Sequence, residues 1–524
     1  MRAFPARRRR LAIGVIVGLA LLLAACTSIV RASVANDGTQ GNGVSWFPSL
    51  SNDGRYVAFE SSASNLVPGD TNNVSDIFVR DLVAKTIARV SVNSNGVQAN
   101  RNSSMPRIDD SGQFVAFISD STNLGGTFAL WAYVHNTKTG VTEPILPTDN
   151  FDLDLSGSSR YVAAVVSGNV DVYDRFAQTT DTIAGPASKP SISDNGQYVA
   201  FMRPRPSGSG GATDIFVRDR VAGTTTQVSF PAPSTGYPSY ISGSEPQISG
   251  NGRYVAYTES ELVNAEPPDT FSYRHEIYVF DRQAGTLARA DIGSDGTPGQ
   301  NWDAQVHAIS DDGRDVMFRS GALVPAENGG DNEYVRDRVA NQTYLVDRNQ
   351  NEAIANDWSS YGSDISGDGS SVAMSSQATN LVPNDTNGTI DVFVRAFPGA
   401  PPPPPPSTTT TQPRIPKVHL VPACTSDEPY AIDLRVENFP VEEIRANITI
   451  TYADNNKLTN GRWFTPDNAG AATFPDLVPN ATQPYTVDYN MFEDTNHDGF
   501  QNGSEGTIAT GFVPISNPCS SPTP

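Results

Sequence analysis

Short apolar runs separated by turn-forming residues dominate most of this chain. The clearest run is Tyr56–Ser61, which is rich in β-branched and aromatic residues and follows Asn52-Asp53-Gly54. Such runs favour strands, and Asn/Asp-Gly tolerates the positive φ that tight hairpin turns need. The pattern therefore predicts antiparallel strands joined by tight turns.

The phrase around this turn returns along the chain, at a spacing of roughly 40–60 residues. Its copies are Asp53–Phe59, Ser111–Phe117, Ser158–Ala163, Asn195–Phe201, Asn251–Tyr257, Asp312–Phe318 and Asp368–Met374. A phrase that returns at such intervals indicates a repeat architecture.

One unit divides into four predicted strands, namely 47–51, 56–61, 77–81 and 87–92. Four short strands with turn signals between them form one blade of a β-propeller. The third-strand phrase is a second count of the units: Asp76–Asp81, Leu130–Val134, Val170–Arg175, Asp214–Asp219, Glu276–Asp281, Glu333–Asp337 and Asp391–Arg395. Both counts predict an all-β, seven-bladed propeller, with six blades as the alternative because the third unit is the weakest.

The last unit lacks a fourth strand after Arg395, and a matching strand stands near the N-terminus. Ser28–Val34 resembles Thr86–Val92, the fourth strand of the first unit. We expect residues 28–34 to complete the last blade, which would close the ring and leave no unpaired edge. The propeller domain is then residues 26–397.

The repeated Asp-Gly-Arg-x-Val-Ala-Phe phrase resembles the WD40-like (PD40) repeats of TolB-type propellers. The resemblance covers roughly residues 28–397 and implies the propeller fold. It does not imply the function of TolB, because TolB-type proteins carry an extra α/β domain before the propeller and this chain has no room for one. Propellers also host many unrelated functions.

Residues 1–25 read as a lipoprotein signal peptide. Arg7–Arg10 is a basic region, Leu11–Leu23 is an apolar stretch too short for a comfortable membrane span, and Leu23–Cys26 is typical of a bacterial lipobox. The alternative is an ordinary signal peptide with a chance cysteine. Export by the Sec route or, from Arg8-Arg9, by the twin-arginine route stays open. We expect an exported protein, lipid-anchored at Cys26 on the extracytoplasmic side of a bacterial membrane.

The charge of the chain excludes some partners. The formal net charge is −21, and removal of Arg2 and Arg7–Arg10 would take it to −26. Nucleic acids need basic patches, so we expect no nucleic-acid partner. The closing strand begins so soon after Cys26 that the propeller rim should rest close to the bilayer. Either the first residues fray from the ring, or the rim beside the anchor is less acidic than the rest.

A linker and a second domain follow the propeller. Residues 398–417 include Pro401–Pro406 and four threonines, and polyproline is extended and semi-rigid. Residues 418–519 predict a small Ig-like or transthyretin-like β-sandwich, with a disordered tail over 520–524. Cys424 and Cys519 bracket this domain, and we expect a disulfide between them in an exported protein. Its expected strands are 431–436, 444–452, 461–464, 485–491 and 507–513.

The sharpest chemical motif is the twelve-residue segment 494–505. It matches an EF-hand loop at its diagnostic positions, and Gly499 allows the sharp turn. The expected calcium ligands are Asp494, Asn496, Asp498, Phe500 through its carbonyl, Asn502 and Glu505. Strand-like flanks depart from the EF-hand pattern, so we expect a structural Ca²⁺ rather than a sensor.

Two weaker sets of candidates lie in the propeller. Asp70, Asn72 and Asp76 recur as Asp385, Asn387 and Asp391 and offer oxygen ligands, although Asx-turns use the same residues. Several aromatic residues precede first strands and are expected on the face with the longer loops, where they would stack on a ligand or pack between blades. They are Trp46, Trp302, Trp358, Tyr237 and Tyr240.

No catalytic motif is visible in the sequence: the five histidines lack metal-ligand spacing, and no nucleophile elbow, P-loop or dinucleotide fingerprint is present. We interpret the chain as a membrane-anchored, non-catalytic binding or scaffold module for a protein or polysaccharide at the cell envelope. One alternative is a carbohydrate-active hydrolase or lyase that uses carboxylates on the long-loop face. A second is a structural spacer.

Overall fold

The computed structural model divides into two compact units, Met1–Pro403 and Pro404–Pro524. In the first unit it describes residues 28–397, apart from 128–129, 206–211, 230–240, 267–269, 300–303, 322, 324–331 and 358. In the second unit it describes the backbone of seven strands.

Seven four-stranded antiparallel sheets make up the first unit. Blades one to three comprise β2 (Ser45–Leu50), β3 (Tyr56–Ser61), β4 (Asp76–Asp81), β5 (Thr86–Arg89), β6 (Ser103–Ile108), β7 (Phe114–Ser119), β8 (Trp131–Asn136), β9 (Thr142–Pro147), β10 (Leu153–Leu155), β11 (Tyr161–Val166), β12 (Asn169–Asp174) and β13 (Thr179–Ala184). Blades four and five comprise β14 (Ser188–Ile192), β15 (Tyr198–Pro204), β16 (Thr213–Asp219), β17 (Thr224–Gln227), β18 (Ile241–Ile248), β19 (Tyr254–Glu266), β20 (Thr270–Asp281) and β21 (Thr286–Arg289). Blades six and seven comprise β22 (Gln305–Ile309), β23 (Asp315–Ser320), β24 (Asn332–Asp337), β25 (Gln342–Leu345), β26 (Ser359–Ile365), β27 (Ser371–Ser376), β28 (Asp391–Ala396) and β1 (Ile29–Arg31).

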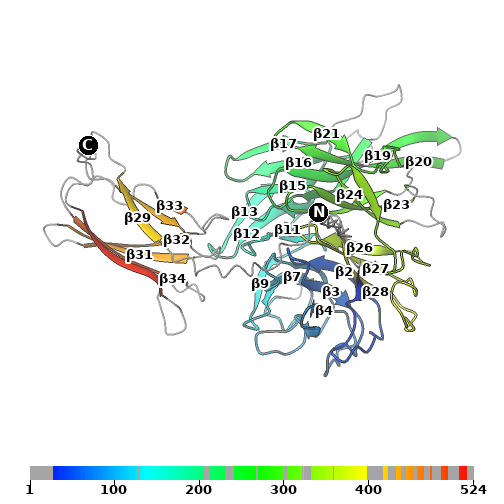
Figure 1. Ribbon diagram of the computed structural model, residues 1–524, viewed down its shortest axis with the longest axis horizontal. Coiled ribbons are helices and arrows are strands. Elements are labelled where there is room, and N and C mark those ends of the chain that lie inside the picture. Colours follow the sequence, from blue (N-terminus) through cyan, green and yellow to red (C-terminus); the bar gives the residue numbers. More distant parts are fainter. Residues whose placement is uncertain are drawn as a thin grey trace, which may run out of the picture. The chain divides into compact units, whose positions relative to one another are not determined.

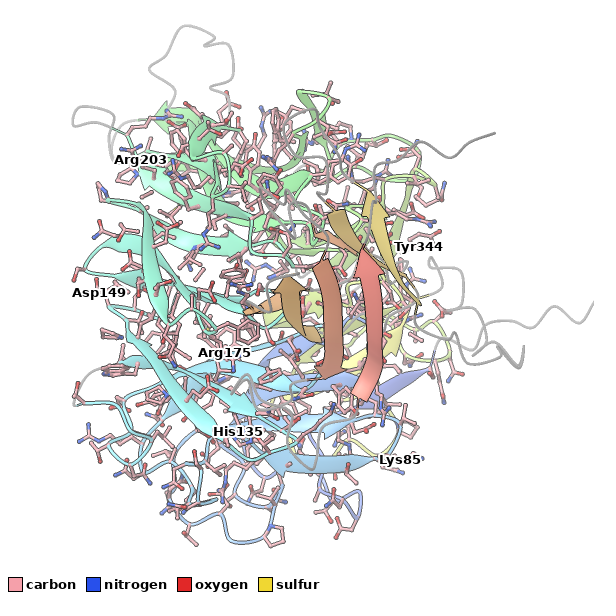
Figure 2. All side chains as sticks on the ribbon, turned by 90° about the vertical axis from the view of Figure 1, so that its left-hand side faces the viewer. Lys85, His135, Asp149, Arg175, Arg203 and Tyr344 are labelled. Carbon is pink, nitrogen blue, oxygen red and sulfur yellow. The ribbon has the colours of Figure 1, made fainter. Side chains whose placement is uncertain are left out.

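The sheets stand around a common axis as a seven-bladed β-propeller, which confirms the count of seven and rules out six. In Figure 1 the colours run around the ring until the blue and yellow blades meet. Figure 2 shows the ring from another side, with labelled residues of blades one, two, three, four and six following one another around it.

The N-terminal strand closes this ring. β1 pairs antiparallel with β28, and Ile29 lies opposite Arg395 while Arg31 lies opposite Phe393. The last sheet therefore has the order β1-β28-β27-β26. The match between residues 28–34 and residues 86–92 predicts this position for the N-terminal strand.

The repeated phrase is explained by contacts within and between blades. Gly54 occupies the turn with φ of 66°, and the Arg55 guanidinium pairs with the Asp81 carboxylate at 2.7 Å. The Tyr56 ring packs so closely on Gly112 of the next blade that a Cβ there would overlap it. Repetition of these contacts fixes the spacing of neighbouring blades.

The Val-Ala-Phe part of the phrase is buried on both faces of the sheet. Val57 and Phe59 pack with residues of blade seven, whereas Ala58 packs with residues of blade two. A strand covered on both sides is expected to be continuously apolar rather than alternating.

The two ends of the ring differ. We call short-turn face the end formed by turns between strands one and two and between strands three and four, such as 51–55 and 82–85 in blade one. The long-loop face carries the connections between strands two and three, such as 62–75.

The second unit contains two antiparallel sheets, β29-β30-β33 and β32-β31-β34-β35. Its strands are β29 (Lys417–Pro422), β30 (Ile432–Glu437), β31 (Ile444–Tyr452), β32 (Lys457–Phe464), β33 (Ala472–Phe474), β34 (Tyr485–Glu493) and β35 (Thr507–Ile515). Its assignment as Ig-like or transthyretin-like stays a prediction. Within the described part of the chain no helix is long and apolar enough to cross a membrane.

Candidate functional site

The inner strands of all seven blades enclose a cavity of about 370 Å³ on the propeller axis. Six carboxylate residues line it, against two basic residues, Arg107 and Lys189. The acids are Asp110, Asp154, Asp194, Glu245, Asp311 and Asp364. The cavity is therefore negatively charged and favours positively charged groups.

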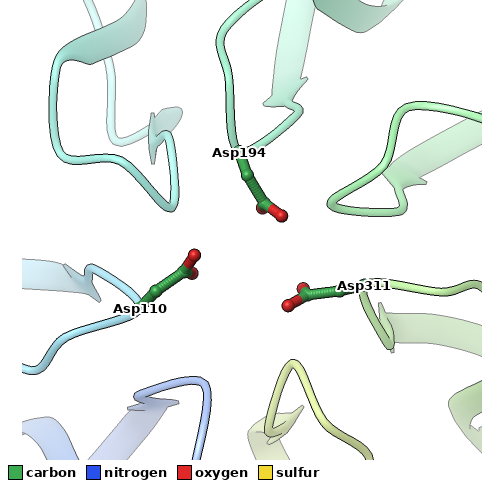
Figure 3. A group of neighbouring side chains, drawn as sticks. All are labelled: Asp110, Asp194 and Asp311. Atoms are coloured by element: carbon green, nitrogen blue, oxygen red, sulfur yellow. The ribbon is translucent and has the colours of Figure 1, made fainter. Parts of the chain in front are cut away.

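Three aspartates from alternate blades meet at the short-turn end of the cavity. Asp110, Asp194 and Asp311 each offer a carboxylate oxygen, and these atoms lie within 4.8 Å of one another. Figure 3 shows the three carboxylates pointing toward a common centre. We call these three residues the axial aspartates. Three hard oxygen donors at this separation suit a divalent cation such as Ca²⁺, Mg²⁺ or Mn²⁺.

Glycines alternate with the axial aspartates around the ring. The position after the first-strand serine or aspartate is a glycine in blades three, five and seven. A Cβ on Gly157 would overlap the Asp110 carboxylate, and Gly250 and Gly367 stand in the same relation to the other two axial aspartates. The missing side chains leave room for each carboxylate to extend over the next blade. The seventh position is Asn52, whose Nδ2 donates to Asp311 Oδ2 at 2.7 Å.

Backbone hydrogen bonds link these seven turns into a closed ring. One amide of each turn donates to a carbonyl of the neighbouring turn, at 2.9–3.1 Å. The pairs are Asn52 to Asp110, Asp110 to Gly157, Ser158 to Asp194, Asp194 to Gly250, Asn251 to Asp311, Asp311 to Gly367 and Asp368 to Asn52. The axial aspartates therefore project from a backbone whose position every blade helps to fix.

The electrostatics of the axial aspartates favour a cation or a shared proton. Burial raises the pKa of all three carboxyls, and the neighbouring carboxylates raise it further. For Asp110 and Asp194 the second cause is the charge of Asp311. Three like charges this close are not all ionised at neutral pH without a counter-charge.

A ring of strained residues lies farther along the cavity wall. Phe47, Met105, Lys189 and Glu245 have φ of 49°, 54°, 53° and 49°. All four line the cavity, and we call them the bulge residues. Positive φ is uncommon for residues other than glycine, and the proline that follows each bulge residue restricts the backbone further.

Each bulge residue stands at a shift of register between the first and second strands of its blade. Bulges re-aim side chains, and strained backbone concentrates at ligand-binding positions. Blade seven has Gly362 at the same place, with φ of 82°. The Lys189 ammonium lies 3.2 Å from Asp152 Oδ1 and 3.5 Å from Glu245 Oε1, which ties blades three, four and five together at this level.

Asp154 and Asp364 also line the cavity but have structural partners. Asp364 Oδ2 accepts a hydrogen bond from the Leu50 amide at 2.8 Å, and Asp154 Oδ2 accepts one from the Ile192 amide at 2.7 Å. Each therefore connects its inner strand to the inner strand of the next blade.

Of the five predicted ligand-face aromatics, the structure describes only Trp46. Trp46 lies on β2 beside Phe47, with ring centroids 6.2 Å apart, but the bulge turns Phe47 into the cavity and leaves Trp46 outside its lining. Trp302, Trp358, Tyr237 and Tyr240 lie outside the described residues.

Arginines lie beside the acidic loops that the sequence analysis names as weak metal candidates. Arg89 Nη1 is 3.2 Å from Asp70 Oδ1 and 3.2 Å from Asp76 Oδ2, and Asn72 Nδ2 donates to Asp76 at 3.0 Å. In the last blade Arg31 contacts Asp385 at 2.8 Å and Asp391 at 3.4 Å. Asn387 donates to Asp391 at 2.9 Å. In both places an arginine of the chain supplies the positive charge beside the carboxylates.

Other predicted sites lie outside the described residues. They are the lipidation site Cys26, the Cys424–Cys519 pair, the tail 520–524 and the calcium loop with Asp494, Asn496, Asp498, Phe500, Asn502 and Glu505. The strands that flank this loop, β34 and β35, pair antiparallel.

Neither the axial aspartates nor the bulge residues were predicted from the sequence. Alignment of the repeats contains a signal for the first group, because the same turn position alternates between aspartate and glycine from blade two to blade seven. The second group is marked only by a proline that follows different residues in four inner strands.

No family model and no curated protein matches the chain, so the resemblance to TolB-type repeats stays a prediction. Among solved structures, the β-propeller domain of the Trilobed protease from Pyrococcus furiosus is 15% identical, with a TM-score of 0.43, over 67% of this chain and 93% of that one. An oligogalacturonate lyase from Vibrio parahaemolyticus is 10% identical, with a TM-score of 0.44, over 71% of this chain and 99% of that one. An acylaminoacyl peptidase from Pyrococcus horikoshii is 14% identical, with a TM-score of 0.42, over 75% and 57%. These likenesses carry nothing about the function of this chain.

Proposed function

We propose that this protein is an exported, lipid-anchored binding module that takes a positively charged group into its axial cavity. The observation that carries the proposal is the convergence of the axial aspartates within 4.8 Å of one another in a cavity with six acids and two bases. The counter-charge is either a divalent cation or an ammonium group of the ligand. Either positive charge would stabilise the ionised form of three carboxylates that repel one another.

The ligand belongs to the cell envelope in this proposal, as a protein or a polysaccharide. A cavity of about 370 Å³ holds a side chain or one sugar residue rather than a whole polymer. The bulge residues combine an aromatic, a thioether, an ammonium and a carboxylate on the wall. Such a mixture suits recognition of one amphipathic group at the end or along the side of a longer chain.

The remaining parts of the chain have supporting roles in this proposal. Cys26 carries the lipid, the polyproline linker separates the domains, and the second domain is closed by a Cys424–Cys519 disulfide. Its loop 494–505 binds a structural Ca²⁺.

Binding by the mature chain from Thr27 onward tests the proposal. The chain is screened against envelope glycans and envelope protein extract, with Mn²⁺, with Ca²⁺ and with a chelator. We expect retention of a ligand that falls when the axial aspartates are replaced together by asparagine. Asp53→Asn is the matched control, because Asp53 shares the turn of Asn52 and accepts hydrogen bonds from Ser51 Oγ and the Arg55 amide. Equal retention by the triple variant and the control would refute a role for the cavity.

A carbohydrate-active enzyme is the second candidate. The axial aspartates favour it, because glycoside hydrolysis uses a pair of carboxylates about 5–5.5 Å apart in retaining enzymes, one of them with a raised pKa. Glycan chain lengths measured after the screen separate the two candidates. Shortened chains that depend on the axial aspartates would support the enzyme and oppose the binding module.

A further inference from the structure

The most exposed apolar residues of the described chain lie on the short-turn face. Among the described residues, the three most exposed large apolar side chains are Val221, Val339 and Val83, at 81%, 76% and 72% exposure. All three occupy the same position in the turn between strands three and four, in blades four, six and one. Phe176 has this position in blade three and is 37% exposed.

These turns are held rigid by their first residue. Asp81 Oδ1 accepts hydrogen bonds from the amides of Val83 and Ala84, both at 2.9 Å. Asp219 and Asp337 make the same pair of bonds in blades four and six. A carboxylate that caps two successive amides fixes the turn. The valines are therefore presented to solvent by a repeated, ordered structure.

The charge of these turns is largely compensated. The turn aspartate of blade one pairs with Arg55, and the turn aspartate of blade six pairs with Arg314 at 2.6 Å. Blades three and five contain the equivalent pairs, at 2.8 Å and 2.7 Å. The turns that display the valines are thus much less repulsive to an anionic surface than the net charge of the chain suggests.

The chain enters the ring at this same face. Ile29 lies opposite Arg395, near the end of β28, so β1 begins at the short-turn face and runs toward the long-loop face. Blade seven has no turn between strands three and four, because its fourth strand is β1. The other six blades place that turn around the rim, and the seventh place is where the chain arrives from Cys26.

The tether between a lipid on Cys26 and the ring is short. Two peptide units separate Cys26 from Ser28, and an extended residue spans at most about 3.6 Å. The lipid would therefore hold this edge of the propeller within roughly 10 Å of the bilayer. No other part of the described ring has this constraint.

We propose that the short-turn face docks on the surface of the lipid bilayer, with Val83, Val221 and Val339 in contact with it. The inference rests on the lipid attachment included in the proposed function. Apolar side chains on a membrane-facing surface enter the interface, and such contacts add to a single lipid anchor. The long-loop face then points away from the membrane.

Cysteine accessibility in the lipidated full chain tests this orientation. The protein is inserted from detergent into preformed vesicles of phosphatidylcholine and phosphatidylglycerol. Val221→Cys, Val339→Cys and, as control, Thr71→Cys in the exposed long loop of blade one are treated separately with a membrane-impermeant maleimide. The unsubstituted chain gives the background from native cysteines. We expect modification of the two rim positions to slow several-fold from detergent to vesicles, and modification at position 71 to stay unchanged.

Intact mass and flotation with the vesicles separate failure of the anchor from failure of the docking. A chain without diacylglycerol on Cys26, or one that does not float, overturns the anchor and with it the docking. The docking alone is overturned if a lipidated, floating chain is modified at the rim positions as fast in vesicles as in detergent, as at position 71. Slower modification at all three positions also overturns the docking, because the reagent then loses access to both faces and the propeller has no preferred orientation. A second measurement uses Phe176→Cys in a Val83→Asp, Val221→Asp and Val339→Asp background. In this triple-aspartate background we expect the maleimide to modify position 176 equally fast in vesicles and in detergent, while the protein still floats with the vesicles.

Discussion

Ser33 and Asp391 are 358 residues apart in the sequence, yet Ser33 Oγ donates a hydrogen bond to Asp391 Oδ1 at 2.5 Å. The same bond joins Ser91 and Asp76 within blade one, at 2.6 Å. The closing strand thus reproduces the contacts of an ordinary fourth strand. Its arginine, Arg31, matches Arg89 and is buried against acidic partners in the same way.

We expect Arg31→Ala to lower the free energy of unfolding by about 3 kcal/mol, because it leaves buried carboxylates without their counter-charge. Arg89→Ala is the matched variant at an internal blade and should cost a similar amount. Only Arg31→Ala should speed hydrogen exchange in residues 28–34 and in β28. Denaturant unfolding and exchange measurements check both effects. Similar exchange in the two variants would show that this pair does not hold the ring closed.

The turn aspartates should stabilise the fold at neutral pH and lose this effect in acid. A hydrogen bond from Arg55, followed by those from the amides of the turn, lowers the pKa of Asp81 to about 2. A folded pKa below the unfolded value of about 3.9 contributes stability above that value, which is lost as the pH falls toward 2. Asp81→Asn should therefore be less stable than wild type at pH 6, and the difference should vanish near pH 2. A difference that is constant with pH would exclude the electrostatic origin.

The axial aspartates should have the opposite dependence. Burial and the neighbouring carboxylates raise the pKa of Asp194 above its unfolded value. Its stabilising proton is bound at low pH and is lost as the pH rises through the folded pKa, so the ionised cluster destabilises the protein in mildly alkaline solution. Without divalent cations, Asp194→Asn should be more stable than wild type by roughly 1–2 kcal/mol at pH 9 and equal to it near pH 4. Asp53→Asn, in the turn of Asn52, should not reproduce this gain.

Sequence reasoning predicted the propeller because each blade repeats local signals, such as the Asp53-Gly54 turn and the Val57–Phe59 run, which suffice to define strands. It did not identify the axial aspartates, because Asp110, Asp194 and Asp311 come together only when the ring closes. It named Trp46 as a ligand-face aromatic and did not identify Phe47, the neighbouring residue that lines the cavity. A shift of one position reverses the face that a strand residue occupies, and nothing in the local composition marks that shift.

The strain at the bulge residues predicts an unusual response to glycine. Met105 has φ of 54°, a conformation that costs roughly 1–2 kcal/mol for a residue with a Cβ. Met105→Gly relieves this strain while it removes a half-buried side chain, so we expect the free energy of unfolding to change by less than about 1 kcal/mol. Ligand retention in the screen should fall. A large loss of stability would mean that Met105 is a packing residue.

Gly157 offers a way to move one axial carboxylate without removing its charge. A Cβ at this position would overlap the Asp110 carboxylate, whereas the φ of Gly157 is outside the left-handed region that requires glycine. Gly157→Ala should therefore displace the Asp110 side chain and leave the turn in place.

If the axial aspartates bind a divalent cation, Mn²⁺ should raise the Tm of wild type at pH 8 but not at pH 4.5, and Gly157→Ala should lose most of this shift. Gly250→Ala and Gly367→Ala should behave alike, because each glycine adjoins one of the other two carboxylates. The reference protein and all variants carry Asp494→Ala and Asp498→Ala, so that the predicted calcium loop does not contribute. A full Mn²⁺ shift in all three glycine variants would place the cation elsewhere.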